Sequence, residues 1–141
     1  MARLLVIEDE PNIAGIILYK LRREGHDVEH ASGVAAARAL TGPWDLVLLD
    51  SSLPDEDALA LVDDWHRAVP VVVMTESRDE RTPVLATGRG AVAIVRKPFK
   101  PTLLARLVIE VTGAAKRDTS HSTGTEPRGL IAAMGSAEVG A

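Results

Sequence analysis

Five short runs of aliphatic residues, separated by stretches with helical periodicity, constrain the fold of this 141-residue chain more than any other feature. The first, third and fourth runs are continuously apolar over the length of a strand, as is typical of strands buried on both faces of a parallel sheet. Aromatic residues make up only 3% of the chain, so we expect a core of aliphatic side chains. The five predicted strands are Leu4–Ile7, Val28–Ala31, Leu46–Leu49, Val71–Met74 and Ala91–Val95.

Amphipathic stretches between these runs predict helices. Residues 12–24 carry isoleucine and leucine at intervals of three and four, and Gly25 is expected to end that helix. Three more helices are predicted at residues 33–41, with Ser32 as N-cap and Gly42 as stop, at residues 57–67, and at residues 101–112, beginning at Pro101.

The helix after the fourth run has two possible starts. Ser77 to Glu80 form a capping box, but Pro83 would then lie inside the helix and clash with a carbonyl of the preceding turn. Alternatively, Thr82 is the N-cap and Pro83 the first helical residue. Both alternatives predict a short or kinked helix.

The alternation of five strands and five helices predicts an α/β doubly wound domain over residues 1–113. Residues 114–141 are rich in Gly, Ser, Thr and Ala and show no sustained period, so we expect a flexible, disordered tail. This stretch is too short and too polar for a folded DNA-binding domain, which suggests that the protein acts by docking to another chain.

Composition excludes several classes of function. The absence of cysteine removes disulfides, thiolate nucleophiles and Cys-ligated metals, and the four histidines are scattered. A net charge of −4 with dispersed basic residues argues against nucleic-acid binding. No apolar run approaches the roughly 18 residues of a membrane span. Met1 to Arg3 lead straight into the first strand, without the pattern of a signal peptide, so we expect a cytoplasmic protein.

Polar side chains follow four of the predicted strands. Ligands of open parallel sheets bind at the carboxyl ends of the strands, so these side chains are expected to converge. Clustered carboxylates attract a hard cation such as Mg²⁺, and a carboxylate beside such an ion can attack phosphorus. The residues are Glu8, Asp9 and Glu10 after the first strand, Asp50 after the third, Thr75 after the fourth, and Lys97 and Pro98 after the fifth.

Four motifs resemble the receiver domain of two-component response regulators, in its single-domain, chemotaxis-regulator-like form. They are VIEDE at residues 6–10, LVLLDSSLP at residues 46–54, VVVMT at residues 71–75 and IVRKPF at residues 94–99. They occur in the family's order, and the resemblance covers about residues 2–113. The resemblance implies a flavodoxin-like fold with strand order 2-1-3-4-5.

The resemblance also implies a role for each site residue. Asp50 would accept a phosphoryl group from a sensor histidine kinase or a phosphotransfer protein. Asp9 would bind Mg²⁺ directly and Glu8 through a water, with Asp50 and the backbone carbonyl of Ser52 completing the protein ligands. Thr75 and Lys97 would bind the phosphoryl group, and the peptide bond before Pro98 is usually cis in this family.

Some positions depart from the family. The aromatic residue three positions before the lysine, which normally couples to the threonine, is Ile94 here. The small residue after the threonine is replaced by Glu76, and the glycine early in the third helix by Ala58. The residues to which the resemblance assigns the phosphoryl chemistry thus match the family, whereas residues of the signalling face differ from it.

These observations predict a single-domain response regulator that accepts a phosphoryl group on Asp50 with Mg²⁺ and signals by docking to a protein target. It would be a switch rather than a conventional enzyme. The alternative is a pseudo-receiver, a protein-binding module that works without phosphorylation, which Ile94, Glu76 and Pro83 favour. A phosphohydrolase is disfavoured because Ser52 stands where such enzymes need a second acid. Glu10 and the acids at residues 55–57 are also explained as helix-start charges.

Overall fold

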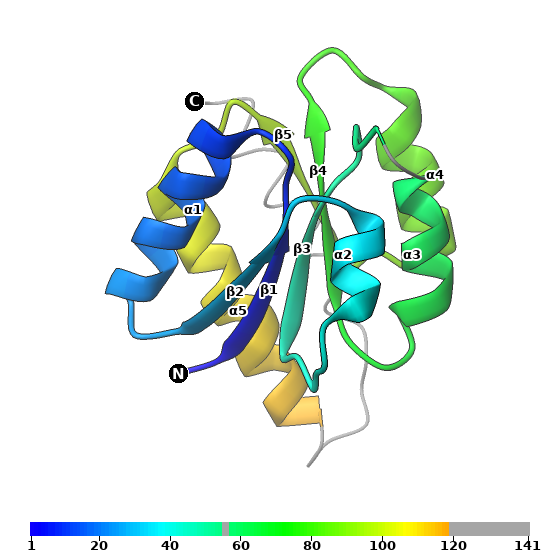
Figure 1. The fold of residues 1–141 in the computed structure, drawn as a ribbon. Helices are drawn as coiled ribbons and strands as arrows, with labels where there is room; N and C mark the ends of the chain where they lie inside the picture. The colour runs from blue at the N-terminus through cyan, green and yellow to red at the C-terminus, as the bar shows by residue number, and fades with distance from the viewer. Residues whose placement is uncertain (55–56, 119–141) are drawn as a thin grey trace.

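The protein forms a parallel sheet with helices on both faces, seen in a computed structural model that describes residues 1–54 and 57–118. Within these residues the sheet has five strands in the order β2-β1-β3-β4-β5 (Figure 1). The predicted flavodoxin-like topology is therefore confirmed. The strands are β1 (Arg3–Ile7), β2 (Asp27–Ala31), β3 (Leu46–Asp50), β4 (Val71–Glu76) and β5 (Ala93–Lys97).

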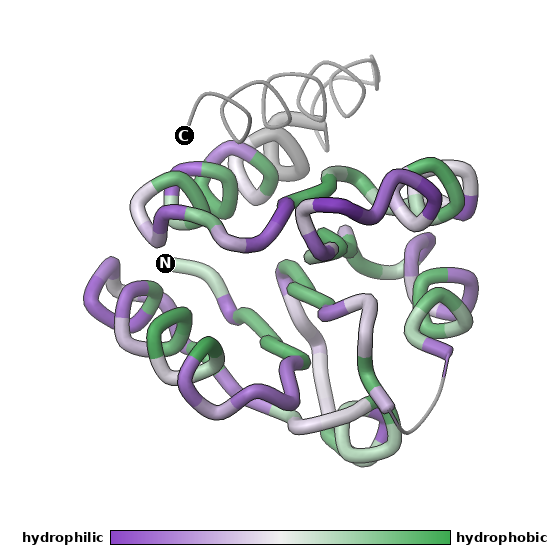
Figure 2. Tube along the Cα trace, turned by 90° about the horizontal axis from the view of Figure 1, so that it is seen from above, coloured by the Kyte–Doolittle hydropathy of each residue, from purple (hydrophilic) through white to green (hydrophobic). Residues whose placement is uncertain are grey.

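The five helices of the described residues divide between the two faces of the sheet. They are α1 (Pro11–Arg23), α2 (Val34–Ala39), α3 (Ala58–Trp65), α4 (Arg81–Arg89) and α5 (Pro101–Asp118). Helices α1 and α5 cover one face, and α2, α3 and α4 cover the other (Figures 1 and 2). This is the arrangement that right-handed crossovers between parallel strands produce.

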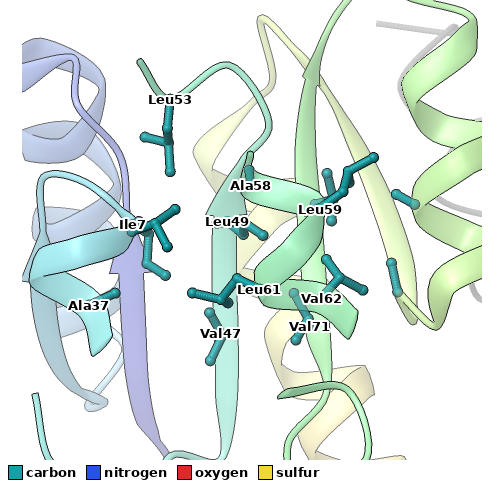
Figure 3. Close-up of a cluster of buried hydrophobic side chains, with 14 of the residues drawn as sticks. Ile7, Ala37, Val47, Leu49, Leu53, Ala58, Leu59, Leu61, Val62 and Val71 are labelled. Atoms are coloured by element: carbon teal, nitrogen blue, oxygen red, sulfur yellow. The ribbon is translucent and has the colours of Figure 1, made fainter. Parts of the chain in front are cut away.

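Each face of the sheet has its own aliphatic core. On the first, Ile17 of α1 and Leu104 of α5 pack against alternate residues of the central strands, such as Leu48. On the second, Leu61 and Val62 of α3 lie over Val47, Leu49 and Val71 (Figure 3). Residues of both faces of β1 and β3 are completely buried, which explains why these strands read as continuous aliphatic runs.

Strand β5 begins two residues later than predicted. The N–H of Ala91 bonds the carbonyl of Ala86, and Gly90 adopts the left-handed conformation with φ +116°. This hydrogen bond closes the C-terminus of α4, so Ala91 belongs to the helix end and not to the strand. The resulting shift carries Lys97 into β5 as its last residue.

The ends of α1 agree with the sequence analysis, whereas those of α2 do not. Glu10 caps α1 through a bond from the N–H of Asn12, and Gly25 follows the helix with φ +94°. Ser32 does not cap α2, because the extended Gly33 is the N-cap and provides no side-chain bond. The helix ends at Ala39 because Leu40 is already extended, so Gly42 is not its stop.

Both predicted starts of α4 are wrong, although its shortness is confirmed. The helix begins at Arg81, and Oδ1 of Asp79 accepts the N–H groups of Arg81 and Thr82 at 3.0 and 2.9 Å. Pro83 is the third residue of the helix. An N–H in the first turn has no partner within a helix, so a proline is tolerated there.

Helix α5 begins at Pro101 as predicted and continues to Asp118, beyond the predicted end at residue 112. Gly113 does not stop the helix, because glycine inside a helix costs only about 1 kcal/mol. The predicted tail falls mostly on residues 119–141, outside the described residues, and the boundary at residue 113 stays a prediction. No helix of the described residues is long and apolar enough to cross a membrane.

Candidate functional site

Three carboxylates meet at the carboxyl edge of the sheet. Glu8 and Asp9 follow β1, and Asp50 ends the neighbouring strand β3, where Ile7 pairs with Leu49. Oxygen atoms of all three lie within 4.8 Å of one another. Glu8 and Asp50 are each only 1% exposed, whereas Asp9 faces solvent. The ends of the two strands therefore hold three acidic groups close together, two of them buried and one exposed.

Lys97 lies between the two buried carboxylates. Its Nζ is 2.8 Å from Oε1 of Glu8 and 3.3 Å from Oδ1 of Asp50. The lysine belongs to β5, which is separated from β3 by β4, so its long stem reaches across a strand to make both contacts. Three carboxylates against one ammonium leave the site with an excess of negative charge.

Burial and charge act in opposite directions on these groups. Burial raises the pKa of Glu8, although the hydrogen bonds from Lys97 and from the N–H of Glu10 oppose the shift. Burial also acts to raise the pKa of Asp50, but hydrogen bonds led by that from the Ser52 N–H, together with the charge of Lys97, hold this pKa below its usual range. Burial disfavours the ammonium of Lys97, yet its two carboxylate partners raise its pKa. Asp50 is thus held as the anion, the form that a nucleophile requires.

Ser52 orients Asp50. Its N–H and its hydroxyl both donate to Oδ1 of Asp50, at 3.1 and 3.0 Å. The contribution of the hydroxyl was missed by the sequence analysis, which assigned only the backbone carbonyl of Ser52 to the metal. That assignment stays a prediction.

Thr75 contributes a buried hydroxyl. It lies near the end of β4, the strand next to β3, and is completely buried. Within the described part of the chain its Oγ1 has no hydrogen-bond partner. A buried polar atom without a partner costs free energy in a folded protein and is typical of a functional site. The hydroxyl is therefore available to an incoming ligand.

The remaining predicted positions lie around this group. Ile94 is buried in the core beneath α4, and the Lys97–Pro98 peptide bond is cis. Glu76 is exposed and is the register partner of Lys97. Glu76, Lys97 and Pro98 also line a cavity of about 380 Å³, whose other walls are Ile13, Ile16, Ser77 and Phe99.

Two residues next to the site were not singled out from the sequence. Arg96 donates to carbonyls of the loop between β4 and α4, and Asp79 of that loop caps α4. Neither contact follows from strand periodicity, since both depend on the conformation of the loop. In the sequence, the only signs of these contacts are an arginine directly before Lys97 and an aspartate inside the capping box of Ser77 to Glu80.

The acidic cluster suits a hard divalent cation. Its donors are all carboxylate oxygens, which Mg²⁺ prefers, and they are close enough to share one ion. The excess of negative charge gives a reason for a cation to bind, because uncompensated buried carboxylates repel one another. The residues present therefore fit Mg²⁺.

A parallel sheet of order 2-1-3-4-5 with carboxylate, hydroxyl and ammonium groups at its carboxyl edge defines the flavodoxin-like receiver class. The model of the family described as the response regulator receiver domain matches residues 4–109, and the chain belongs to this family. Receiver domains are signalling modules of two-component systems that are phosphorylated by histidine kinases.

Relatives share both sequence and fold with the chain. It is 34% identical over 107 residues to the transcriptional regulatory protein VxrB of Vibrio cholerae, covering 74% of this chain and 44% of VxrB. It is 37% identical over 112 residues to the DNA-binding response regulator MtrA of Mycolicibacterium smegmatis, covering 74% and 48%. The chain thus spans about half the length of these curated relatives.

Two solved structures illustrate the likeness of fold. NtrX from Brucella abortus is 34% identical with a TM-score of 0.72, over 84% of this chain and 28% of NtrX. A CheY-like receiver domain protein from Methanospirillum hungatei has a TM-score of 0.77 over 84% of this chain and 98% of its own, at 24% identity. The second match supports the fold alone.

Proposed function

We propose that the protein accepts a phosphoryl group on Asp50 in a Mg²⁺-dependent reaction and signals as a single-domain response regulator by docking to a protein target. The donor would be a sensor histidine kinase or a phosphotransfer protein. The observation that carries the proposal is the setting of Asp50. Its carboxylate is buried, lies next to two further acids, and is 3.3 Å from the ammonium of Lys97.

The proposed reaction divides the chemistry among residues of four strand ends. An oxygen of Asp50 attacks phosphorus, the bond from phosphorus to the histidine nitrogen of the donor breaks, and the imidazole leaves with the electron pair. Mg²⁺ held by Glu8, Asp9, Asp50 and the Ser52 carbonyl would supply positive charge. Ser52 keeps Asp50 oriented, Lys97 neutralises charge on the transferred group, and the Thr75 hydroxyl donates a hydrogen bond to it.

The proposed signal is a shift of populations. A phosphoryl group adds about 1.5–2 negative charges at neutral pH. Lys97 would then turn from Glu8 toward the new group, and Thr75 would move inward to bond it. Both movements act on the loop between β4 and α4, and so on the surface offered to a partner. The protein would thus be a switch rather than a conventional enzyme, and its cytoplasmic location stays a prediction.

The test is phosphorylation of the purified chain. With Mg²⁺ and a small phosphodonor such as acetyl phosphate, intact-mass spectrometry should show the addition of one phosphoryl group. The variant Asp50→Asn should stay unmodified, because its amide is a poor nucleophile, whereas the surface control Asp63→Asn should react like the wild type. Modification of Asp50→Asn, or an unreactive wild type, would contradict the proposal.

The pseudo-receiver remains the second candidate, supported by the acid Glu76 beside the site and by the aliphatic Ile94 in place of an aromatic. A Mg²⁺ titration followed by NMR separates the two functions. A receiver that is phosphorylated should show shifts at residues around Asp9 and Asp50. A spectrum without such shifts would favour the pseudo-receiver.

A further inference from the structure

Arg96 lies beside Thr75 in the sheet without belonging to the acidic cluster. It is the register partner of Thr75 in the pairing of β4 with β5. Partners in adjacent parallel strands project toward the same face of the sheet, which here is the face covered by α4. Arg96 is therefore next to Thr75 across the ladder.

The guanidinium of Arg96 holds the loop that leaves β4, which stands above the sheet edge in Figure 1. Its Nη1 donates to the Asp79 carbonyl at 2.9 Å and to the Ser77 carbonyl at a longer 3.4 Å. Ser77 is only two residues after Thr75. Arg96 of β5 thus holds the loop immediately after the end of β4.

The same contact reaches the start of α4. The N–H of Asp79 bonds the Glu76 carbonyl at 3.1 Å, which closes a turn, and the carboxylate of Asp79 caps the helix. Arg96 also contributes to the lowered pKa of Asp79, after the hydrogen bonds from Thr82 and Arg81. A continuous set of polar contacts therefore joins β5, the loop and α4.

Apolar burial does little to hold this loop. Glu76, Ser77, Arg78 and Glu80 are all exposed. A segment that buries little apolar surface is of low local stability unless polar contacts restrain it. The bonds from Arg96 are accordingly a main restraint on the chain that leads out of Thr75.

We propose that Arg96 is a positioning residue for Thr75: by tying the β4–α4 loop to β5, it holds the Thr75 hydroxyl ready to bond the phosphoryl group on Asp50. This inference rests on the proposed function and adds to it a residue outside the acidic cluster. The physical reason is entropy. A hydroxyl on a restrained strand end binds with less loss of freedom than one on a loose loop.

The test is a double-mutant cycle on binding of a phosphoryl mimic. The probe is beryllium fluoride with Mg²⁺, titrated into the full chain and followed by NMR. Arg96→Gln should weaken binding about three- to tenfold, of the order expected for one hydrogen bond, and Thr75→Ala should weaken it similarly. In the Thr75→Ala background, Arg96→Gln should have no further effect, because Arg96 acts through Thr75.

Two further variants keep the test decisive. Arg96→Lys retains a cationic donor and should recover part of the affinity. Arg78→Gln removes an exposed guanidinium from the same loop and should bind like the wild type. If Arg96→Gln does not fold, the cycle is run with Arg96→Lys, whose smaller loss must also vanish in the Thr75→Ala background.

Three results would count against the inference. Wild-type affinity in Arg96→Gln overturns it, as does an equal loss with and without Thr75, and in either case the proposed function stands. An equal loss in Arg78→Gln also overturns it, because charge alone would then explain the effect. A wild-type protein that does not bind the mimic at all removes the proposed function itself.

Discussion

Lys97 shows why single residues of the site depend on one another. Two carboxylates with 1% exposure would be costly without a partner, and the ammonium 2.8 and 3.3 Å away offsets part of this cost. Yet one positive charge cannot balance three negative ones. Asp50 is thereby kept ionised and oriented by Ser52, while the local charge still favours a cation. The convergence of these residues was predictable from strand ends, but their pairing was not.

His26 allows a prediction of pH dependence at the same scale. Its Nδ1 accepts the N–H of Ala2 at 3.1 Å, and its buried Nε2 has no partner among the described residues. Burial, together with the positive N-terminus, lowers the pKa of His26 from 6.5, so the unfolded chain binds the proton more readily. The contribution of neutral His26 to the free energy of unfolding is therefore fully present above pH 6.5. It is lost as the pH falls from there toward the lower pKa of the folded state.

Urea unfolding at about pH 7.5 and about pH 5.5 tests this prediction. The wild type should lose free energy of unfolding on acidification, and His26→Asn, which retains an acceptor for the Ala2 N–H, should lose less. His66→Asn is the control and should keep the wild-type dependence. An unchanged pH dependence in His26→Asn would refute the role of His26.

At the scale of elements, the interiors of strands and helices were predicted better than their ends. The strand β3 was recognisable because burial on both faces requires an aliphatic run, and the helix α1 because its buried stripe repeats every three to four residues. The ends depend on loop conformation. Gly33 rather than Ser32 precedes α2, and Asp79 rather than Ser77 caps α4. In both cases the packing of the helix decides where its first N–H groups lie, and this position decides which residue precedes or caps the helix.

The cap of α4 is testable by substitution. Asp79→Ala leaves two N–H groups of the first turn without their acceptor and should lower the free energy of unfolding by about 1 kcal/mol. Asp79→Asn, which keeps an acceptor, should cost less. Glu80→Ala is the matched control, because Glu80 makes no side-chain cap bond, and its cost should stay within about 0.5 kcal/mol.

Hydrogen exchange separates loss of the cap from a general loss of stability. In Asp79→Ala the amides of Arg81 and Thr82 should exchange faster, while those of β3 should change only with global stability. An equal loss of free energy of unfolding in Asp79→Ala and Glu80→Ala would show that the Asp79 cap does not contribute to stability. The Asp79 carbonyl is retained in every variant, so the bond from Arg96 is not removed.

At the scale of the whole molecule, the two aliphatic cores fix the positions of the charged groups of the site. Each central strand is locked on both faces by aliphatic side chains, so its carboxyl end cannot retreat from the repulsion between Glu8, Asp9 and Asp50. Packing energy from the entire domain thus maintains a locally unfavourable cluster of charge. This relation could be argued from the sequence, because the acids directly follow the aliphatic runs.

The same relation predicts that Mg²⁺ stabilises the whole protein. A cation that binds the folded state alone raises the free energy of unfolding with concentration, by about 2.7 kcal/mol at one hundred times its dissociation constant. The melting temperature of the wild type should therefore rise through a Mg²⁺ titration. In Asp9→Asn the rise should be much smaller, while the metal-free melting temperature should be higher than that of the wild type, because one repelling charge is gone.

The surface control Asp63→Asn also loses a carboxylate, but one outside the cluster, and it should keep the full response to Mg²⁺. If Asp9→Asn and Asp63→Asn responded alike, the cation would be acting through general screening of the acidic surface. A metal response lost only in Asp9→Asn, combined with the higher metal-free stability of that variant, would instead show that the folded domain stores repulsion at this edge of the sheet and that Mg²⁺ relieves it.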